Sequence, residues 1–377
     1  MISGAAVIAG IGNTAYGKHP GRDRVSLIVE ACANALNDAG IDKQLVDGVL
    51  VKMANAEPSF LYGQKVAEAL GLRPNIGASL DQGGAANIGL ISYAAMAIEA
   101  GLMQVAIICY GDTPRTGSRS VYQRPRGDDA VYGWYSTAAG YAMVHQRYRQ
   151  EFNLADECFG AVAVAFRANG ARNPQAHLRQ AITLDDYMAS PFVVEPLRRD
   201  DCCLLSDGAA AIVVMSRQHA RSLGIDKAVP ILGFGQGQES WDVQLRPSLT
   251  STKACVSADI AFRMAGIARK DIDVAQLYDC FTVTPLLTLE DYGFFPPGQA
   301  ASFAAAGGMA LDGQLPCNTS GGLLSETGTP GLQLVIEGVR QMRGDAVLQI
   351  PRARHCLVSN QGGTMHTHAT LILGAAA

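Results

Sequence analysis

The stretch SLDQGGAANIGLISYAAMAIEAG, residues Ser79 to Gly101, predicts a strand, a tight glycine turn and a helix. The glycine pair Gly83 and Gly84 follows a strand-like lead-in, and the residues after it are mostly small and apolar. Small residues let backbones approach closely, and the first turn of a helix presents free N–H groups to an anion or oxyanion. The tip of the turn carries no Ser, Cys or Lys. The stretch therefore predicts a platform for a reacting group that lacks a nucleophile of its own.

Strands and helices alternate on both sides of this stretch. An amphipathic helix is predicted from Val25 to Gly40, and buried strands from Val105 to Asp112 and from Ala209 to Met215. In the second half, a strand VPILGFGQG, a helix KACVSADIAFRMAGI and a strand VAQLYDCF repeat the order. This alternation is typical of a mostly parallel sheet covered by helices. Because the two halves resemble each other, we expect a duplicated α/β unit.

Residues 113–200 interrupt the alternation. This segment is rich in Arg, Gly and Tyr and contains two predicted helices, Tyr141 to Phe152 and Cys158 to Asn173. We therefore expect three parts. The predicted first half comprises 1–112 and 201–226, the inserted loop domain 113–200, and the second half 227–377.

The composition excludes several classes of protein. Of the 377 residues, 48% are hydrophobic and 17% charged, and the net charge is −4, so nothing indicates binding to nucleic acid or an anionic membrane. The apolar runs are too short for a membrane span, and the N-terminus lacks a signal-peptide pattern. Nine cysteines without a CxxC motif are typical of a reducing compartment. We expect a cytoplasmic protein.

Six segments, in order, carry a resemblance to a known family: IAGIGNTAYGK, AAMAIEAG, SDGAAAIVV, YDCFT, LPCNTSGGLLSE and SNQGGTMHTHATLIL. Together they span nearly the whole chain, which resembles the thiolase superfamily and, within it, the lipid-transfer or sterol-carrier branch. The resemblance implies a thiolase fold, a duplicated five-layer α-β-α-β-α body with an inserted loop domain. It also implies a homodimer or higher oligomer and an acyl-CoA substrate.

The reactive positions of that family are not retained here. Gly84 stands where the resemblance places the nucleophilic Cys, and Gly328 stands near the position of the assisting His. The second Cys position falls at Ser359 or Asn360. Glycine cannot form an acyl-enzyme thioester, so ordinary thiolysis is not expected. We expect the missing side chain at Gly84 to leave space for a bulkier acyl chain.

Other residues offer different chemistry. Backbone N–H groups at Gly84 and Gly362 could form an oxyanion hole for an enolate. Tyr278 of YDCF is a candidate general acid or base, and its neighbour Asp279 could orient the site. Asn318 of CNTSGG could hydrogen-bond a substrate carbonyl.

His366 and His368 are further candidate bases. They alternate with Thr367, so on a strand both side chains would face one side. A metal site would need a third ligand, and none follows nearby, so no metal is expected.

Each of these candidates also has a structural interpretation. Tyr278 could be a buried, hydrogen-bonded hydroxyl at a strand end, and Asp279 a loop cap. Gly84 could be a packing glycine at a tight turn. A different alternative is catalytic: Cys280 or Cys317 could replace the missing nucleophile.

Arginines in residues 113–200 suggest how a CoA ester could bind. Through the resemblance, Arg115, Arg119 and Arg124 could pair with the phosphates of CoA, although exposed loops often carry solvated charge. No permanently bound cofactor is expected, and the CoA thioester is the substrate.

The resemblance extends to members without the Cys, which are retro-aldolases of steroid side-chain breakdown. They act on β-hydroxyacyl-CoA with a small partner that carries a zinc ribbon and an OB-fold. We therefore expect an acyl-CoA aldolase or lyase that cleaves a β-hydroxyacyl-CoA through an enolate, with such a partner. The alternatives are a degenerate thiolase-like acetyl-CoA acyltransferase and a non-catalytic acyl-CoA or lipid-binding subunit.

Overall fold

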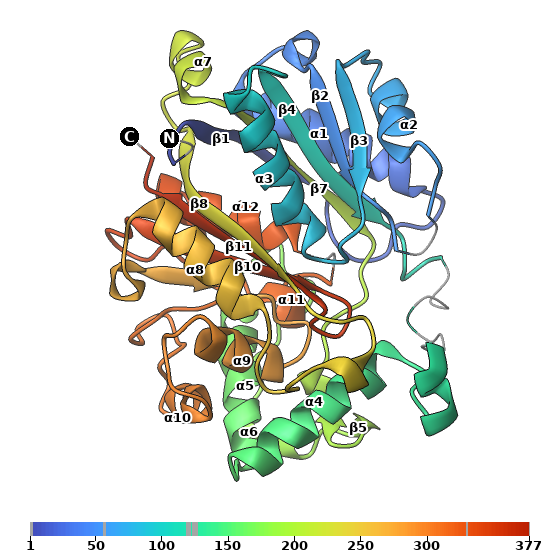
Figure 1. Cartoon of the computed structure of the whole chain (residues 1–377), viewed down its shortest axis with the longest axis vertical. Coiled ribbons are helices and arrows are strands. Elements are labelled where there is room, and N and C mark those ends of the chain that lie inside the picture. Colours follow the sequence, from blue (N-terminus) through green and yellow to red (C-terminus); the bar gives the residue numbers. More distant parts are fainter. Residues whose placement is uncertain (1–2, 56–57, 118–121, 123–126, 329–330, 377) are drawn as a thin grey trace.

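The computed structural model describes residues 3–55, 58–117, 122, 127–328 and 331–376. Its main sheet has the strand order β3-β2-β4-β7-β1-β8-β11-β10-β9. The strands at the middle of this sheet are weakly paired, because β1 and β8 pair only at Val7 with Pro230 and at Ile8 with Val229. The strands therefore divide into two sheets that meet along a narrow seam (Figure 1).

The first sheet is parallel at its outer edge. β2 runs parallel to both β3 and β4, with Val49 opposite Gly77 and Ile107. β7 is antiparallel to β4, and β1 is antiparallel to β7. Its strands are β1 (Ala6–Asn13), β2 (Gly48–Lys52), β3 (Ile76–Leu80), β4 (Val105–Asp112) and β7 (Gly208–Ser216).

The second sheet ends the chain. β10 is parallel to β9 and antiparallel to β11, which is in turn antiparallel to β8. Its strands are β8 (Val229–Gln238), β9 (Val274–Gln276), β10 (His355–Gly362) and β11 (Thr367–Gly374).

Helices form three layers around these sheets. On the outer face of the first sheet lie α1 (Arg24–Ala39), which Asp23 caps at Ser26 N (2.7 Å) and Gly40 ends, and α2 (Tyr62–Ala69). Between the sheets lie α3 (Ala86–Glu99) and α12 (Leu332–Arg343), both buried along most of their length, as helices with two apolar neighbours must be. On the outer face of the second sheet lies α8 (Ala254–Ala265). The predicted five-layer fold is confirmed.

The segment between β4 and β7 packs beside this body (Figure 1). It contains α4 (Thr137–Glu151), α5 (Asp156–Arg172), α6 (Leu184–Met188) and a small sheet of β5 (Phe192–Val194) with β6 (Leu197–Arg198). α5 packs against short helices of the second half. The predicted domain boundaries stay a prediction. The remaining helices are α7 (Arg217–Ser222), α9 (Val283–Asp291), α10 (Gln299–Ala305) and α11 (Gly322–Ser325).

One predicted strand is shorter than its sequence indicates. The run VAQLYDCF forms β9 only over Val274–Gln276. At the next two residues, Leu277 and Tyr278, the backbone bonds side chains instead of a neighbouring strand. The side chain of Asn318 accepts the N–H of Leu277 through Oδ1 and donates to the Leu277 carbonyl through Nδ2. Ser359 Oγ accepts the N–H of Tyr278. Tyr278 therefore lies in a loop and not on a strand.

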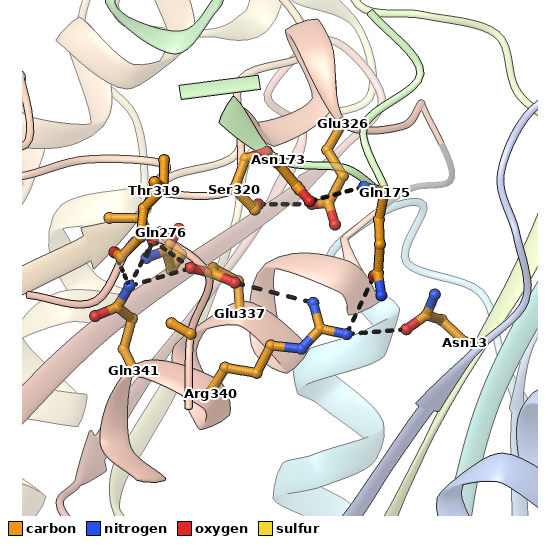
Figure 2. A network of polar contacts seen from close by, with 12 residues as sticks. Asn13, Asn173, Gln175, Gln276, Thr319, Ser320, Glu326, Glu337, Arg340 and Gln341 are labelled. Atoms are coloured by element: carbon orange, nitrogen blue, oxygen red, sulfur yellow. Dashed lines mark hydrogen bonds and ion pairs between the residues drawn. The ribbon is translucent and has the colours of Figure 1, made fainter. Parts of the chain in front are cut away.

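A buried polar network connects the two halves of the molecule (Figure 2). On α12, Glu337 accepts hydrogen bonds from Thr319 Oγ1 (2.5 Å) and Gln341 Nε2 (3.1 Å). The guanidinium of Arg340 lies 4.0 Å from Glu337 and donates to Asn13 Oδ1, at the end of β1, at 3.2 Å. Buried polar groups are costly unless they are bonded, so this network favours one relative placement of the halves.

Candidate active site

The carboxyl ends of the parallel strands meet at the junction of the two halves. Gly83 and Gly84 follow β3, and Gly362 ends β10. Thr367 Oγ1 donates to the carbonyl of Gln82 at 2.7 Å, which ties the two ends together. A Cβ on Gly83 would lie 2.6 Å from Gly362 Cα, so this close approach requires glycine. Loops at such carboxyl edges are where α/β proteins place their sites.

A cavity of about 880 Å³ lies at this junction. Gly83, Gly84, Tyr278 and Gly363 contribute to its wall. Asp81 is the one charged side chain among the described lining residues. Much of the remaining wall is apolar and comes from both halves and from residues 113–200, including Met53, Val193, Val194, Leu204, Phe281 and Leu323. A mostly apolar cavity with a few polar groups is typical of a ligand site.

Gly84 has no room for a side chain. A Cβ there would lie 2.6 Å from Tyr278 Cζ and would also overlap the Tyr278 hydroxyl and the Gln361 carbonyl oxygen. Real Cβ atoms do not approach so closely. The expectation that Gly84 leaves space for a bulkier acyl chain is therefore wrong, because the Tyr278 ring fills that space.

Burial keeps the Tyr278 hydroxyl protonated. It raises the pKa of Tyr278 well above its ordinary value, and the neighbouring Cys280, Cys203 and Tyr122 raise it further. The side chain is buried yet reaches the cavity wall. At neutral pH Tyr278 is therefore a hydrogen-bond donor, and its rare ionised form would be a strong base.

Asn318 and Asp279 support this loop. Asn318 Oδ1 accepts the N–H of Leu277 at 2.6 Å, and its Nδ2 donates to the Leu277 carbonyl at 2.8 Å. The carboxylate of Asp279 accepts the N–H groups of Leu323 (2.8 Å) and Leu324 (3.1 Å), in the first turns of α11. Burial raises the pKa of Asp279 to about 7. Neither side chain lines the cavity. The hydrogen bond of Asn318 to a substrate carbonyl and the orienting role of Asp279 both stay predictions.

The two histidines lie outside the cavity wall. His366 lies in a turn before β11 and not on the strand, so the predicted alternation with His368 is wrong. Its ring bonds the N–H of Thr364 (2.8 Å) and the carbonyl of Trp241 (2.8 Å). His368 is buried on β11, and burial lowers its pKa to about 3. Neither histidine is among the described residues that line the cavity, and their roles as bases stay predictions.

The remaining candidates are also placed. Arg115 bonds the His177 ring at 3.1 Å and does not line the cavity, while Arg119 and Arg124 lie outside the described residues. Cys280 lines the cavity, but burial raises its pKa to about 11, so it is a thiol. Cys317 is buried and donates to a backbone carbonyl. Among the described residues no cluster of His, Cys, Asp or Glu is arranged to hold a metal.

Three residues at or behind the cavity wall belong to no motif in the sequence. Asn55 and Tyr122 line the cavity, and Lys52 lies behind Asn55, with its Nζ 3.1 Å from Asn55 Oδ1. Lys52 and Asn55 sit at the carboxyl end of β2. No local pattern indicates them, because it is the parallel pairing of β2 with β3 that brings this end beside the glycine turn.

Comparison with known proteins agrees with this arrangement. The chain is 35% identical over 396 residues to the steroid side-chain-cleaving aldolase of Thermomonospora curvata, covering 100% of this chain and 99% of the relative. It is 34% identical over 394 residues to the 17-hydroxy-3-oxo-4-pregnene-20-carboxyl-CoA lyase of Mycobacterium tuberculosis, covering 99% and 100%. Residues 235–375 match the family described as thiolase C-terminal domain-like.

A solved structure is similarly close. The Ltp2-ChsH2(DUF35) aldolase superposes with a TM-score of 0.90 at 34% identity, over 100% of this chain and 99% of that chain. The chain therefore belongs to the thiolase superfamily, in the branch that contains these aldolases and lyases.

Proposed function

We propose that the protein is an enzyme that cleaves the Cα–Cβ bond of a β-hydroxyacyl-CoA by a retro-aldol reaction. The observation that carries this proposal is Tyr278, whose hydroxyl lies where a side chain on Gly84 would begin, at the position that the resemblance gives to the thiolase nucleophile. Thiolysis needs a nucleophile at that place, whereas a retro-aldol reaction needs a group that exchanges a proton there. The names of the two relatives, an aldolase and a lyase, support the same chemistry.

The reaction uses few groups. Tyr278, as phenolate, takes the proton of the β-hydroxyl, and the O–H electron pair forms the new carbonyl. The Cα–Cβ bond breaks, and its electron pair becomes the enolate of the thioester. Backbone N–H groups at Gly84 and near Gly362 support the enolate oxygen. Protonation at Cα then releases a shorter acyl-CoA and a ketone or aldehyde.

A steroid CoA ester suits the cavity. The name of the Mycobacterium tuberculosis relative specifies a 17-hydroxy steroid carrying a 20-carboxyl-CoA group, in which the hydroxyl lies on the carbon β to the thioester. Here the apolar wall of the 880 Å³ cavity would hold the ring system, and Tyr278 would face the hydroxyl. Apolar surface in such a site contributes roughly 25 cal/mol per Å² buried.

Two kinds of partner complete the proposal. β3 is an edge strand of the sheet, and its unpaired backbone would suit a second copy of the chain. We also propose a small partner with a zinc ribbon and an OB-fold, and the name of the similar structure, which includes ChsH2(DUF35), supports a partner protein. Trp241 lines the cavity and is 64% exposed. No described helix is long and apolar enough to cross a membrane, and a cytoplasmic location stays a proposal.

The proposal is tested by incubating the protein, alone and with a DUF35-type partner, with 17-hydroxy-3-oxo-4-pregnene-20-carboxyl-CoA. We expect a 17-ketone and a shorter acyl-CoA in equimolar amounts. Absence of a ketone under both conditions would rule out the aldolase function. A trapped protein thioester would instead indicate a thiolase, and tight binding without turnover would indicate a binding subunit.

A further inference from the structure

A second tyrosine hydroxyl serves the same cavity as Tyr278. Tyr122 contributes to the cavity wall, and the residue is partly buried. Tyr278 lines the same cavity, and Tyr122 is one of the neighbouring groups that raise the pKa of Tyr278, after burial, Cys280 and Cys203. The proton of a third tyrosine at the wall, Tyr141, is used in a structural hydrogen bond, because its hydroxyl donates to the Gly363 carbonyl at 2.7 Å.

The wall near Gly328 cannot supply such a group. Gly328 lines the cavity, but the carbonyl oxygen of Leu204 already occupies the place of a Cβ. A second proton-transferring side chain therefore has to come from elsewhere on the wall, and Tyr122 is placed to supply it.

A buried lysine lies behind Tyr122, with an amide between them. Lys52 is 1% exposed, and its Nζ donates to Asn55 Oδ1 at 3.1 Å. The Asn55 side chain hydrogen-bonds the Tyr122 hydroxyl and lowers the pKa of Tyr122, against the larger raising effect of burial. The three side chains thus form a chain of contacts. The ammonium of Lys52 bonds the Asn55 amide, and the N–H of that amide stabilises negative charge on the Tyr122 oxygen.

The fold explains why this lysine is buried. β2 and β4 are parallel and adjacent, so Lys52 and Asp112 lie at neighbouring carboxyl ends. Asp112 raises the pKa of Lys52, while burial lowers it to about 8. The Nζ also lies 4.0 Å from the ring centroid of Tyr110, whose hydroxyl donates to Asp112 at 3.1 Å. Burying a lysine is costly. The charge of Asp112 and the ring of Tyr110 offset this cost and hold the ammonium next to Asn55.

We propose that Tyr122 is a second catalytic residue, which protonates the enolate at Cα while Tyr278 serves the β-oxygen. This inference rests on the proposed retro-aldol function. In the step, the Tyr122 O–H bond breaks, the enolate electron pair takes the proton to form the Cα–H bond, and the phenolate left behind accepts from Asn55. Tyr278 has meanwhile gained the proton of the β-hydroxyl. Passing one proton from Tyr278 to Tyr122, directly or through water, restores the starting state. Lys52 and Asn55 are positioning residues, which support the charge on Tyr122.

The test separates the two halves of the reaction. The shorter acyl-CoA product, here propionyl-CoA, is incubated with the protein in D₂O, and deuterium at Cα is followed by mass spectrometry. Cleavage of the β-hydroxyacyl-CoA is measured in parallel, and retained folding is checked by thermal melting. The variants are Tyr122→Phe, Tyr278→Phe and, as a control, Tyr93→Phe on the exposed side of α3.

We expect Tyr122→Phe to lose at least roughly 100-fold in both cleavage and exchange, which is the usual contribution of a general acid. Tyr278→Phe should lose cleavage and keep exchange, and Tyr93→Phe should match the wild type in both. Exchange by Tyr122→Phe within twofold of the wild type would overturn the inference. If the wild type exchanges without cleaving, the proposed function fails and the exchange results still decide the role of Tyr122. If it does neither, both proposals are wrong.

The support behind Tyr122 is tested with Lys52→Met. We expect exchange to slow by roughly tenfold with unchanged affinity for propionyl-CoA, because one lost charge-assisted contact has about this effect. Lys52→Arg, which keeps the cation, should recover part of the rate. Equal rates for Lys52→Met and the wild type would limit Lys52 to a structural role and overturn its assignment as a positioning residue.

Discussion

The hydroxyl of Tyr278 lies where a side chain on Gly84 would begin. A Cβ on Gly84 would stand 2.6 Å from Tyr278 Cζ, and the Tyr278 backbone is held by Ser359 at 3.0 Å. The backbone of Tyr278 is therefore fixed, and the ring fills the space beside Gly84. The absent side chain at Gly84 and the tyrosine are therefore one structural feature, because the Tyr278 ring in this place requires glycine at position 84.

This relationship predicts coupling between the two positions. Gly84→Ala should destabilise the protein by roughly 1–3 kcal/mol, as overpacked sites do, and should abolish cleavage. In Tyr278→Ala the clash with the ring is removed and only the clash with the Gln361 carbonyl oxygen remains, so adding Gly84→Ala should cost less than it does alone, with a coupling of about 0.5–3 kcal/mol. Urea unfolding of the four proteins measures this.

Gly77→Ala is the matched control for that cycle. Gly77 lies on β3, and a Cβ there would meet its nearest neighbours at an ordinary 3.7 Å. We expect a change of less than about 1 kcal/mol for this substitution, whether or not Tyr278 is truncated. Strictly additive costs at Gly84 and Tyr278 would show that the two residues do not compete for the same space.

Tyr278→Phe tests the chemistry without changing the packing. We expect kcat to fall by about 10²–10⁴, with KM nearly unchanged, because the ring remains. Burial raises the pKa of Tyr278, so the phenolate is rare at neutral pH and the wild-type rate should increase as pH rises from 7 to 9. Steady-state kinetics over this range measure both effects. Full activity of Tyr278→Phe would remove Tyr278 from the mechanism.

The sequence predicted the elements that local patterns control. The strand Val105–Asp112 has the predicted bounds, and α1 ends one residue before the predicted Gly40. The loop at Tyr278 could not be predicted, because β9 ends where the N–H of Leu277 donates to Asn318 Oδ1, 41 residues away. Tyr122 was also missed as a cavity residue, since it lies in a segment without periodicity. Long-range side-chain contacts leave no local pattern.

Asn318→Ala should show how strongly that distant contact holds the loop. The change leaves the buried N–H and carbonyl of Leu277 without their partners at 2.6 and 2.8 Å. Each orphaned group costs about 1–3 kcal/mol, so we expect a marked fall in Tm and a larger fall in kcat than a rise in KM. Thermal melting and kinetics provide the measurements.

Asn153→Ala serves as the control for Asn318→Ala. Asn153 has a φ of 50°, close to the 46° of Asn318, but it is exposed. Both substitutions therefore carry the same backbone penalty, and only Asn318 adds the lost hydrogen bonds. Equal losses of stability in the two variants would contradict a holding role for Asn318.

Glu326, in the network of Figure 2, predicts how stability depends on pH. It is 2% exposed and accepts a hydrogen bond from Ser320 at 2.6 Å. Burial raises its pKa from 4.5 to about 8, although Arg340 and Ser320 act in the opposite direction. The folded state therefore holds a proton that the unfolded state releases above about pH 4.5. The stability from this group is complete below that pH and is lost as pH rises through 8.

Glu326→Gln keeps the shape and an acceptor but cannot ionise. We expect the variant to be more stable than the wild type at pH 9, by up to about 1.4 kcal/mol for each unit of the pKa shift, and similar to it near pH 5. Urea unfolding at both pH values measures the difference. The exposed Glu68→Gln should change neither value. A Glu326→Gln variant that loses stability at pH 9 would mean that the carboxylate is ionised and held by Arg340, which would reverse the sign of the predicted dependence.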